Sequence, residues 1–203
     1  MSEARPVRKP RQNRGIDSRL RIVDAAYQVF EEKGYYKAST EDVAKAAGVS
    51  IGCLYSYFKD RDALFFEILN QRHHAFIEMF SSDLESGSSN EDISKWLKKQ
   101  ITSLSDYQKS SRHIYADTRS LAFSSQEVSS ILVEQRELRL HIAQEFLNAH
   151  RQKLKIEDAE AAAVLIYNMI TAVTEQIALR QNRISEERLV QVCVDALMAY
   201  LFE

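Results

Sequence analysis

Basic side chains form the densest group of potentially functional residues, close to the start of the chain. Between residues 5 and 14 there are five arginines and lysines and no acidic residue. Residues 1–60 hold 11 Lys and Arg against 8 Asp and Glu, whereas the remaining residues hold 16 against 21. A basic arm on an acidic body indicates a polyanionic partner at one end. A solvated tail that aids solubility would have the same composition.

Residues that could support catalysis or metal binding are scattered. The chain has no glycine-rich phosphate loop, no His-Glu-x-x-His sequence and no nucleophile elbow. His73 and His74 are adjacent, so their rings diverge on a helix and are not expected to share a metal ion. Cys53 and Cys193 lie too far apart for a disulfide framework, and a reducing cytoplasm is the expected location. We therefore expect neither enzymatic activity nor a cofactor.

The composition predicts an all-α fold. Both prolines lie within the first ten residues, and no run of alternating β-branched residues indicates a sheet. The most apolar stretch, residues 159–173, is interrupted by polar residues and too short to span a bilayer, so no membrane partner is expected. Cap residues and apolar periodicity predict a disordered basic tail over residues 1–15 and helices near 18–33, 39–47, 50–58, 60–80, 91–110, 112–122, 125–153, 157–182 and 185–202.

The second and third predicted helices meet at a tight turn. Ser39 and Asp42 fit a capping box, Gly48 supplies the positive φ that the turn needs, and Ser50 can cap the next helix. This is the geometry of a helix-turn-helix, whose second helix enters the major groove of DNA. A packing corner between two helices has the same spacing. We expect residues 16–60 to form this unit and residues 61–203 to form a larger helical domain.

The residues around this turn resemble a known family. Along the chain they are Arg21-Ile22-Val23-Asp24-Ala25-Ala26, Phe30, Lys33-Gly34-Tyr35, Ser39-Thr40, Asp42-Val43-Ala44, Ala47-Gly48-Val49-Ser50 and Gly52-Cys53-Leu54-Tyr55-Ser56-Tyr57-Phe58. At these spacings they strongly resemble the N-terminal segment of the TetR family, bacterial transcriptional regulators that respond to ligands and are mostly repressors. The resemblance covers about residues 18–69, and beyond it only length and helical character agree.

The resemblance implies which residues contact DNA. Thr40 stands where the family contacts a phosphate, at the start of a helix whose free N–H groups suit an anion. Arg61 stands where the family usually has a lysine, and it can clamp a phosphate. Gly52 lets the recognition helix approach the groove, and the two tyrosines match aromatic positions that reach phosphates or thymine methyl groups. The expected DNA-binding residues are Thr40, Ser50, Ile51, Gly52, Tyr55, Tyr57 and Arg61.

Two positions in the recognition helix weaken the expected hydrogen bonding. Cys53 stands where the family often has Thr or Ser, so a phosphate contact is lost there. Its side chain is either a half-buried filler or a redox-sensitive thiol, and the filler is favoured. Ile51 cannot hydrogen-bond to a base edge and would contact a methyl group or read DNA shape. Leu54 and Phe58 are expected in the core.

The C-terminal helices predict a homodimer. Residues 161–173 are apolar nearly all round and the last helix has two apolar stripes, so one face can pack on the body and another on a partner. A monomer with these helices at its centre is the alternative. The expected interface residues are Ala162, Ile166, Met169, Val173, Leu189, Val190, Cys193, Val194, Leu197 and Leu201.

In the resembled family the C-terminal body also binds a small molecule. Such pockets are mostly apolar with a few polar anchors, so a small, largely apolar effector is expected. Asn168 is the preferred candidate because it is polar within a very apolar helix. The full set of candidate ligand-binding residues is Trp96, Tyr107, His113, Tyr115, Arg119, Phe123, Tyr167, Asn168 and Thr171.

These features predict a cytoplasmic, nucleoid-associated regulator. In the simplest form it is a repressor that binds palindromic double-stranded operator DNA as a homodimer and is released by an effector. An all-α enzyme acting on a small molecule and a helical protein-binding adaptor are the alternatives. The adaptor would have to explain the hydroxyl and aromatic pattern from Thr40 to Tyr57 as packing.

Overall fold

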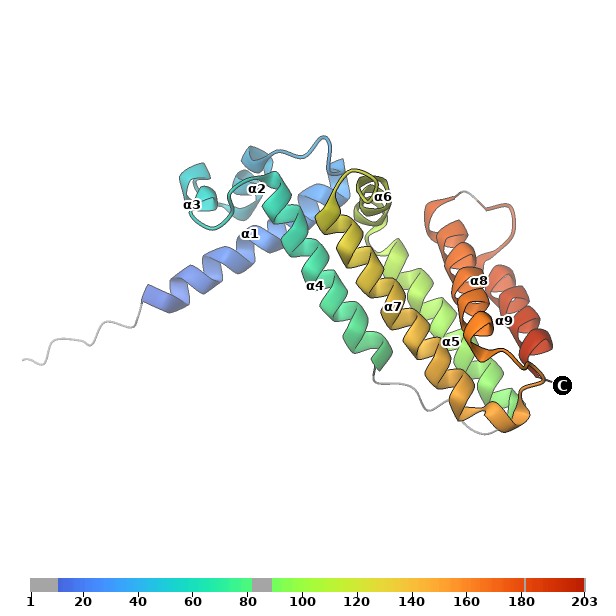
Figure 1. Ribbon diagram of the computed structural model, residues 1–203. Helices are drawn as coiled ribbons and strands as arrows, with labels where there is room; N and C mark the ends of the chain where they lie inside the picture. Colours follow the sequence, from blue (N-terminus) through green and yellow to red (C-terminus); the bar gives the residue numbers. More distant parts are fainter. Residues whose placement is uncertain (1–10, 82–88, 181, 203) are drawn as a thin grey trace, which may run out of the picture. The chain divides into compact units, whose positions relative to one another are not determined.

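The computed structural model describes residues 11–81, 89–180 and 182–202, and it divides into two compact units (Figure 1). The described residues are helical without a strand, apart from an isolated antiparallel bridge between Leu154 and Phe202. The all-α prediction is confirmed. The division falls between Ile68 and Leu69, inside α4, whereas we expected the first unit to end at residue 60.

Four helices contribute to the first unit: α1 (Arg11–Lys33), α2 (Thr40–Ala47), α3 (Ile51–Tyr55) and the first part of α4 (Arg61–Ser81). The predicted start of α1 at Ser18 is wrong, because the helix extends back to Arg11 into the expected tail. Extending an existing helix costs little per residue, no proline follows Pro10, and Gly15 within the extension disfavours the helix by only about 1 kcal/mol. The rest of the tail, residues 1–10, lies outside the described residues.

The apolar face predicted for α1 forms the centre of the first unit. Ile22, Ala26 and Phe30 are fully buried, and the Phe30 ring meets that of Phe65 from α4 edge-on, with centroids 5.3 Å apart. Leu54 of α3 is also fully buried. Since α3 is only five residues long, this contact with the core, rather than helix propensity, holds it in place.

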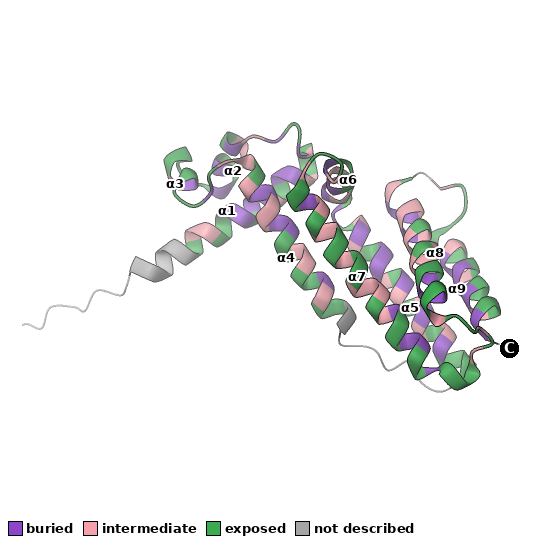
Figure 2. Ribbon diagram, viewed as in Figure 1, coloured by how far each residue is buried: buried purple, intermediate pink, exposed green. Residues whose placement is uncertain are grey.

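The second unit consists of α5 (Asn90–Lys109), α6 (Arg112–Leu121), α7 (Gln126–Ala149), α8 (Ala159–Leu179) and α9 (Glu186–Leu201), with the end of α4 and a short 3-10 turn, Arg151–Lys153. The helix α8 packs against α5, α7 and α9, and α5 also packs against α9. Figure 2 shows the buried stripes on these helices. Their core includes Ile93, Ile101, Leu147 and Leu197, none of which has more than a trace of exposed surface.

Helix α8 continues six residues beyond the apolar stretch 159–173. The whole helix of 21 residues is long and apolar enough to cross a membrane by length and composition alone. Ala162, Ala163, Ile166 and Ile177 on one of its faces are nevertheless buried in the unit's own core. This is the environment of a core helix in a helical domain.

Candidate nucleic-acid interface and ligand cavity

The start of α2 is fixed by a capping box. The Ser39 hydroxyl accepts from the Asp42 backbone N–H at 3.1 Å, and the Asp42 carboxylate accepts from the Ser39 N–H at 3.2 Å. Lys33 lies 2.7 Å from the same carboxylate. The hydrogen bonds from Lys33 and Ser39 lower the pKa of Asp42, so the carboxylate stays ionised and holds the first turn.

The turn that follows α2 has the predicted geometry. Gly48 has φ 65° and ψ 36°, and its N–H bonds back to the end of the helix. Because a side chain at this φ is strained, the turn requires glycine although a Cβ would meet nothing. Ser50 then caps α3 by accepting from the Cys53 N–H at 3.1 Å. The helix-turn-helix expected from these residues is formed.

Hydroxyl groups, two cations and three carboxylates, those of Glu41, Asp60 and Asp62, line one open hollow beside the first turn of α2. The Thr40 Oγ1 and Tyr55 hydroxyl oxygens are 3.0 Å apart, and Lys59 and Arg61 line the same open surface hollow. Thr40 is buried to 8% exposure whereas Tyr55 is half exposed. N–H groups at a helix start carry partial positive charge and bind anions. We call Thr40, Tyr55 and Arg61 the phosphate cluster.

Arg61 is held in this cluster by a residue that the sequence analysis did not single out. Its guanidinium lies 4.2 Å from the centroid of the Tyr35 ring, and its Nε lies 3.8 Å from Asp62. Tyr35 in turn donates its hydroxyl hydrogen to Asp62 at 2.8 Å. Burial and this bond raise the pKa of Tyr35, which keeps the phenol protonated as a donor. Its position directly after Gly34 was visible in the motif, but its role depends on tertiary packing.

The outer face of α3 is exposed. Ile51, Tyr55 and Tyr57 have 38%, 50% and 38% of their surface exposed, and Ser50 and Gly52 are exposed as well. A Cβ at Gly52 would meet no atom within 4 Å, so the protein's own packing does not require a glycine there. The expected core residues Leu54 and Phe58 are buried, and Cys53 is intermediate.

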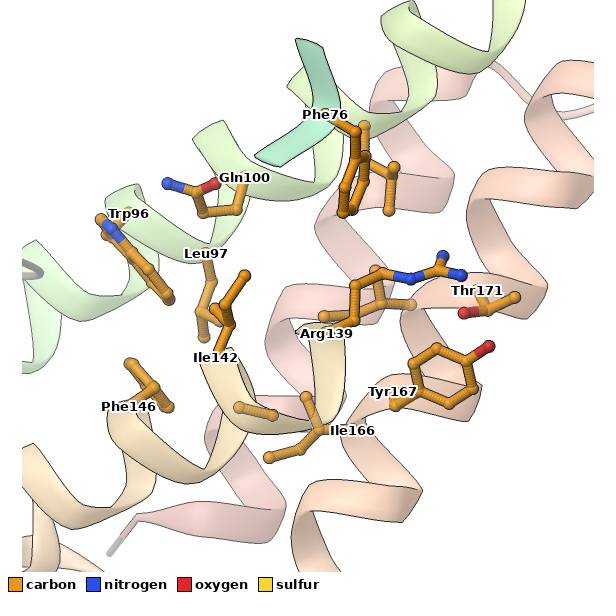
Figure 3. A pocket seen from close by; sticks show the side chains of 13 residues that line it. Phe76, Trp96, Leu97, Gln100, Arg139, Ile142, Phe146, Ile166, Tyr167 and Thr171 are labelled. Atoms are coloured by element: carbon orange, nitrogen blue, oxygen red, sulfur yellow. The ribbon is translucent and has the colours of Figure 1, made fainter. Parts of the chain in front are cut away.

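The second unit contains a mostly apolar cavity of about 90 Å³ (Figure 3). Three of the nine candidate ligand residues line it: Trp96, Tyr167 and Thr171. The sequence analysis missed its other walls, among them Phe76 of α4 and Arg139 and Phe146 of α7. The Trp96 and Phe146 rings stack with centroids 4.9 Å apart. Apolar periodicity marks such residues as core, and only the packing reveals a cavity beside them.

A smaller cavity of about 40 Å³ adjoins the first, since Phe76, Leu104 and Arg139 line both. Three further candidates lie in its wall, Tyr107, Tyr115 and Arg119. Tyr115 donates to Glu175 at 2.9 Å, and Arg119 Nε lies 3.2 Å from the same carboxylate. Burial, followed by the nearby Glu175 charge, raises the pKa of Tyr115, which stays a neutral donor.

The remaining three candidates line neither cavity. Phe123 is 95% exposed, and His113 is exposed. The preferred candidate, Asn168, is also exposed, and its amide donates to the Val164 carbonyl one turn earlier at 2.9 Å. A polar residue in an apolar helix can therefore be satisfied by its own backbone on an outer face. These three predictions are corrected.

The expected dimer residues are also corrected in part. Seven of the ten are buried inside the protomer: Ala162, Ile166, Val190, Cys193, Val194, Leu197 and Leu201. The other three, Met169, Val173 and Leu189, are partly buried against the same core. Each C-terminal helix instead leaves a different apolar stripe exposed. The α8 stripe includes Ala161, Val164, Leu165 and Ala172, and the α9 stripe includes Val192, Ala196, Ala199 and Tyr200.

Comparisons with known proteins agree with this architecture. Residues 22–68 match the family model described as bacterial regulatory proteins, tetR family. The fatty acid metabolism regulator protein of Bacillus subtilis (strain 168) is 30% identical over 86 residues, which are 42% of this chain and 44% of that protein. The chain thus matches less than half of that relative's length.

Two solved structures show the same fold over nearly the whole chain. A protein described as a TetR-family transcriptional regulator from Mesorhizobium loti has a TM-score of 0.70 at 22% identity, covering 96% of this chain and 100% of the other. A transcriptional regulator from Saccharomonospora viridis, in complex with choline, has a TM-score of 0.77 at 13% identity, covering 93% and 99%. Both likenesses therefore include the second unit, which the family model does not match.

Proposed function

We propose that this chain is a ligand-responsive transcriptional repressor of the tetR family of bacterial regulatory proteins, whose family model matches residues 22–68. It binds a palindromic operator as a homodimer in the cytoplasm, at the nucleoid, and a small molecule releases it. The observation that carries this proposal is the phosphate cluster of Thr40, Tyr55 and Arg61 beside the exposed α3. The family is one of regulators, so an enzyme is not favoured.

In this proposal α3 lies in the major groove and α2 crosses the DNA backbone. Ser50, Ile51 and Gly52 at the start of α3 approach base edges, and Tyr57 extends the contact along the groove. The phosphate cluster binds the adjacent strand. The uncharged α3 favours contacts to base edges and methyl groups, while the cations beside it provide the salt-dependent affinity.

The exposed stripes of α8 and α9 are the proposed dimer surface. Val164 and Leu165 on α8 are 36% and 42% exposed, and Val192 on α9 is 66% exposed. Two copies that bury the same stripes would form an isologous four-helix interface. The dimer would then carry two copies of α3, one for each half of a palindrome.

The cavity of the second unit is the proposed effector site. A structural neighbour holds choline, which supports a small-molecule ligand in this fold. Phe76, in the cavity wall, belongs to α4, the same helix that begins at Arg61. A ligand that displaces α4 would thereby move Arg61 and lower the affinity for the operator.

Footprinting of DNA beside the protein's own gene tests this function. We expect protection of two half-sites related by a dyad, and a steep loss of affinity as salt rises from about 50 to about 200 mM. A shuffled duplex of the same composition is the control. If no palindromic site is protected at low salt, with or without a small-molecule extract, the repressor proposal fails.

A further inference from the structure

The larger cavity has one charged residue in its wall, Arg139 of α7. Its Nε donates to the Gln135 carbonyl at 3.2 Å, and its guanidinium lies 4.9 Å from the Tyr167 ring centroid and 5.6 Å from that of Phe76. Among the residues that the structure describes, no carboxylate forms an ion pair with it. The rings fix the direction of the guanidinium, and its outer N–H groups can serve an anion.

The surface of this cavity is almost wholly apolar, and the few polar side chains in its wall lie on one side. Figure 3 shows the Arg139 guanidinium on the same side as the Tyr167 and Thr171 hydroxyl groups. The stacked Trp96 and Phe146 rings lie on the other side, together with Leu97 and Ile142. A ligand that fits both sides has a compact polar head and an apolar tail.

The charged residues around the two cavities indicate whether the polar head of the ligand is an anion or a cation. Three arginines line the two adjoining cavities, Arg72, Arg119 and Arg139, against one acid, Glu175. Glu175 is already paired with Arg119 and Tyr115. Little negative charge is therefore available to a cation, whereas an anion would offset the charge of Arg139.

We propose that the effector is an amphipathic monocarboxylic acid whose carboxylate binds Arg139 and whose apolar tail lies against Trp96, Phe146 and Ile142. This inference rests on the proposed ligand-responsive function and specifies its ligand class. A single carboxylate matches the planar guanidinium with two parallel hydrogen bonds, and the neighbouring hydroxyl groups of Tyr167 and Thr171 can donate to it. A straight tail of several methylene groups suits the apolar wall.

Trp96 makes the binding directly observable, because it is the only tryptophan in the chain and lines the cavity. Octanoate titrated into the full chain without DNA should change the Trp96 emission, and calorimetry should give the same dissociation constant. We expect octanoate to bind at least about tenfold more tightly than 1-octanol, which has the same tail without the charge. Octyltrimethylammonium should bind more weakly than either. From butanoate to hexanoate, affinity should rise by about fourfold for each methylene group.

The variant Arg139→Gln removes the charge and keeps most of the side chain. It should abolish the preference for octanoate over 1-octanol while leaving the affinity for 1-octanol within about threefold of the wild type. The matched control is Arg151→Gln, which removes the same charge from an exposed arginine of the same unit that lines neither cavity. This control should keep the full preference.

Several results would overturn the ligand class. They are equal binding of octanoate and 1-octanol by the wild type, tighter binding of the ammonium compound, retained preference in Arg139→Gln, or no binding of octanoate by fluorescence and calorimetry. The wild-type comparison needs no variant, so a misfolded Arg139→Gln would not prevent a decision. These titrations contain no DNA, so a wrong ligand class would still leave a footprint on the operator. If the repressor proposal is wrong, no footprint is seen.

Discussion

The hydroxyl oxygens of Thr40 and Tyr55 lie 3.0 Å apart, although fifteen positions separate the two residues in the sequence. The contact joins the first residue of α2 to the last residue of α3. Since one hydroxyl donates its hydrogen to the other, the pair keeps one hydroxyl hydrogen that a phosphate oxygen can accept. When Thr40 donates to Tyr55, this hydrogen is the one on the half-exposed Tyr55. The contact also links α2 to α3.

Tyr55→Phe tests this contact while keeping the ring. Loss of one hydroxyl donor to a charged phosphate should lower operator affinity by about tenfold, without a comparable loss of stability. Fluorescence anisotropy with the footprinted operator measures the first and thermal unfolding the second. Tyr36→Phe is the matched control, because Tyr36 is a 62% exposed tyrosine of the same unit outside the phosphate cluster. Equal affinity of both variants would remove Tyr55 from the interface.

Arg61→Gln tests the charge in the same cluster. If each protomer neutralises one phosphate through Arg61, the slope of log affinity against log salt should become shallower by about two for the dimer. Affinity should fall for operator and unrelated DNA alike, because a phosphate contact carries no base information. Arg136→Gln makes the same charge change in the second unit and should leave the slope unchanged. An unaltered slope in Arg61→Gln would place this cation outside the interface.

Gly52 offers a test in which stability and function move in opposite directions. An added Cβ meets nothing within 4 Å, and alanine favours a helix over glycine by about 1 kcal/mol. Gly52→Ala should thus leave the melting temperature unchanged or higher. If α3 approaches the groove as closely as proposed, the methyl group should still lower operator affinity by at least about tenfold. Unchanged operator affinity would show that α3 does not approach the DNA groove closely at Gly52.

The parts predicted correctly from the sequence depend on local rules. The capping box of Ser39 and Asp42, the left-handed Gly48 and the cap at Ser50 each involve residues within four positions of one another. Such contacts form whenever the helices form, so the residue types specify them. The same locality made the helix-turn-helix predictable without a structure.

The parts that could not be predicted depend on which face of a helix meets the core. In α8 both faces are apolar, so periodicity does not distinguish Ile166, which is buried, from Leu165, which is exposed. Likewise Asn168 is a polar residue of the kind that could bind a ligand, but its amide hydrogen-bonds to a carbonyl of its own helix. Arg139, which does line the cavity, lies in a helix with acidic and basic residues on its exposed side, where nothing in the sequence sets it apart.

Val192→Glu tests the proposed dimer surface. Val192 is 66% exposed on α9, so a glutamate there should be tolerated by the protomer but should place two like charges in an isologous interface. We expect a shift from dimer to monomer in sedimentation and a loss of operator affinity, since single half-sites bind weakly. Val133→Glu on α7 is the matched control, because Val133 is 54% exposed outside both stripes. If the Val192→Glu protein remains dimeric, the exposed stripe of α9 is not the dimer interface.

The capping box at α2 predicts how the protein responds to acid. Hydrogen bonds from Lys33 and Ser39 lower the pKa of Asp42 below its ordinary value of 3.8. The ionised carboxylate therefore contributes stability that is fully present above this ordinary value and is lost as pH falls through the lower pKa of the folded state. Asp42→Asn should lower the melting temperature at neutral pH and flatten its fall below about pH 4. Asp24→Asn, an exposed aspartate of α1, should keep the wild-type profile. If Asp42→Asn and wild type fall in parallel as the medium is acidified, the carboxylate does not stabilise the start of α2.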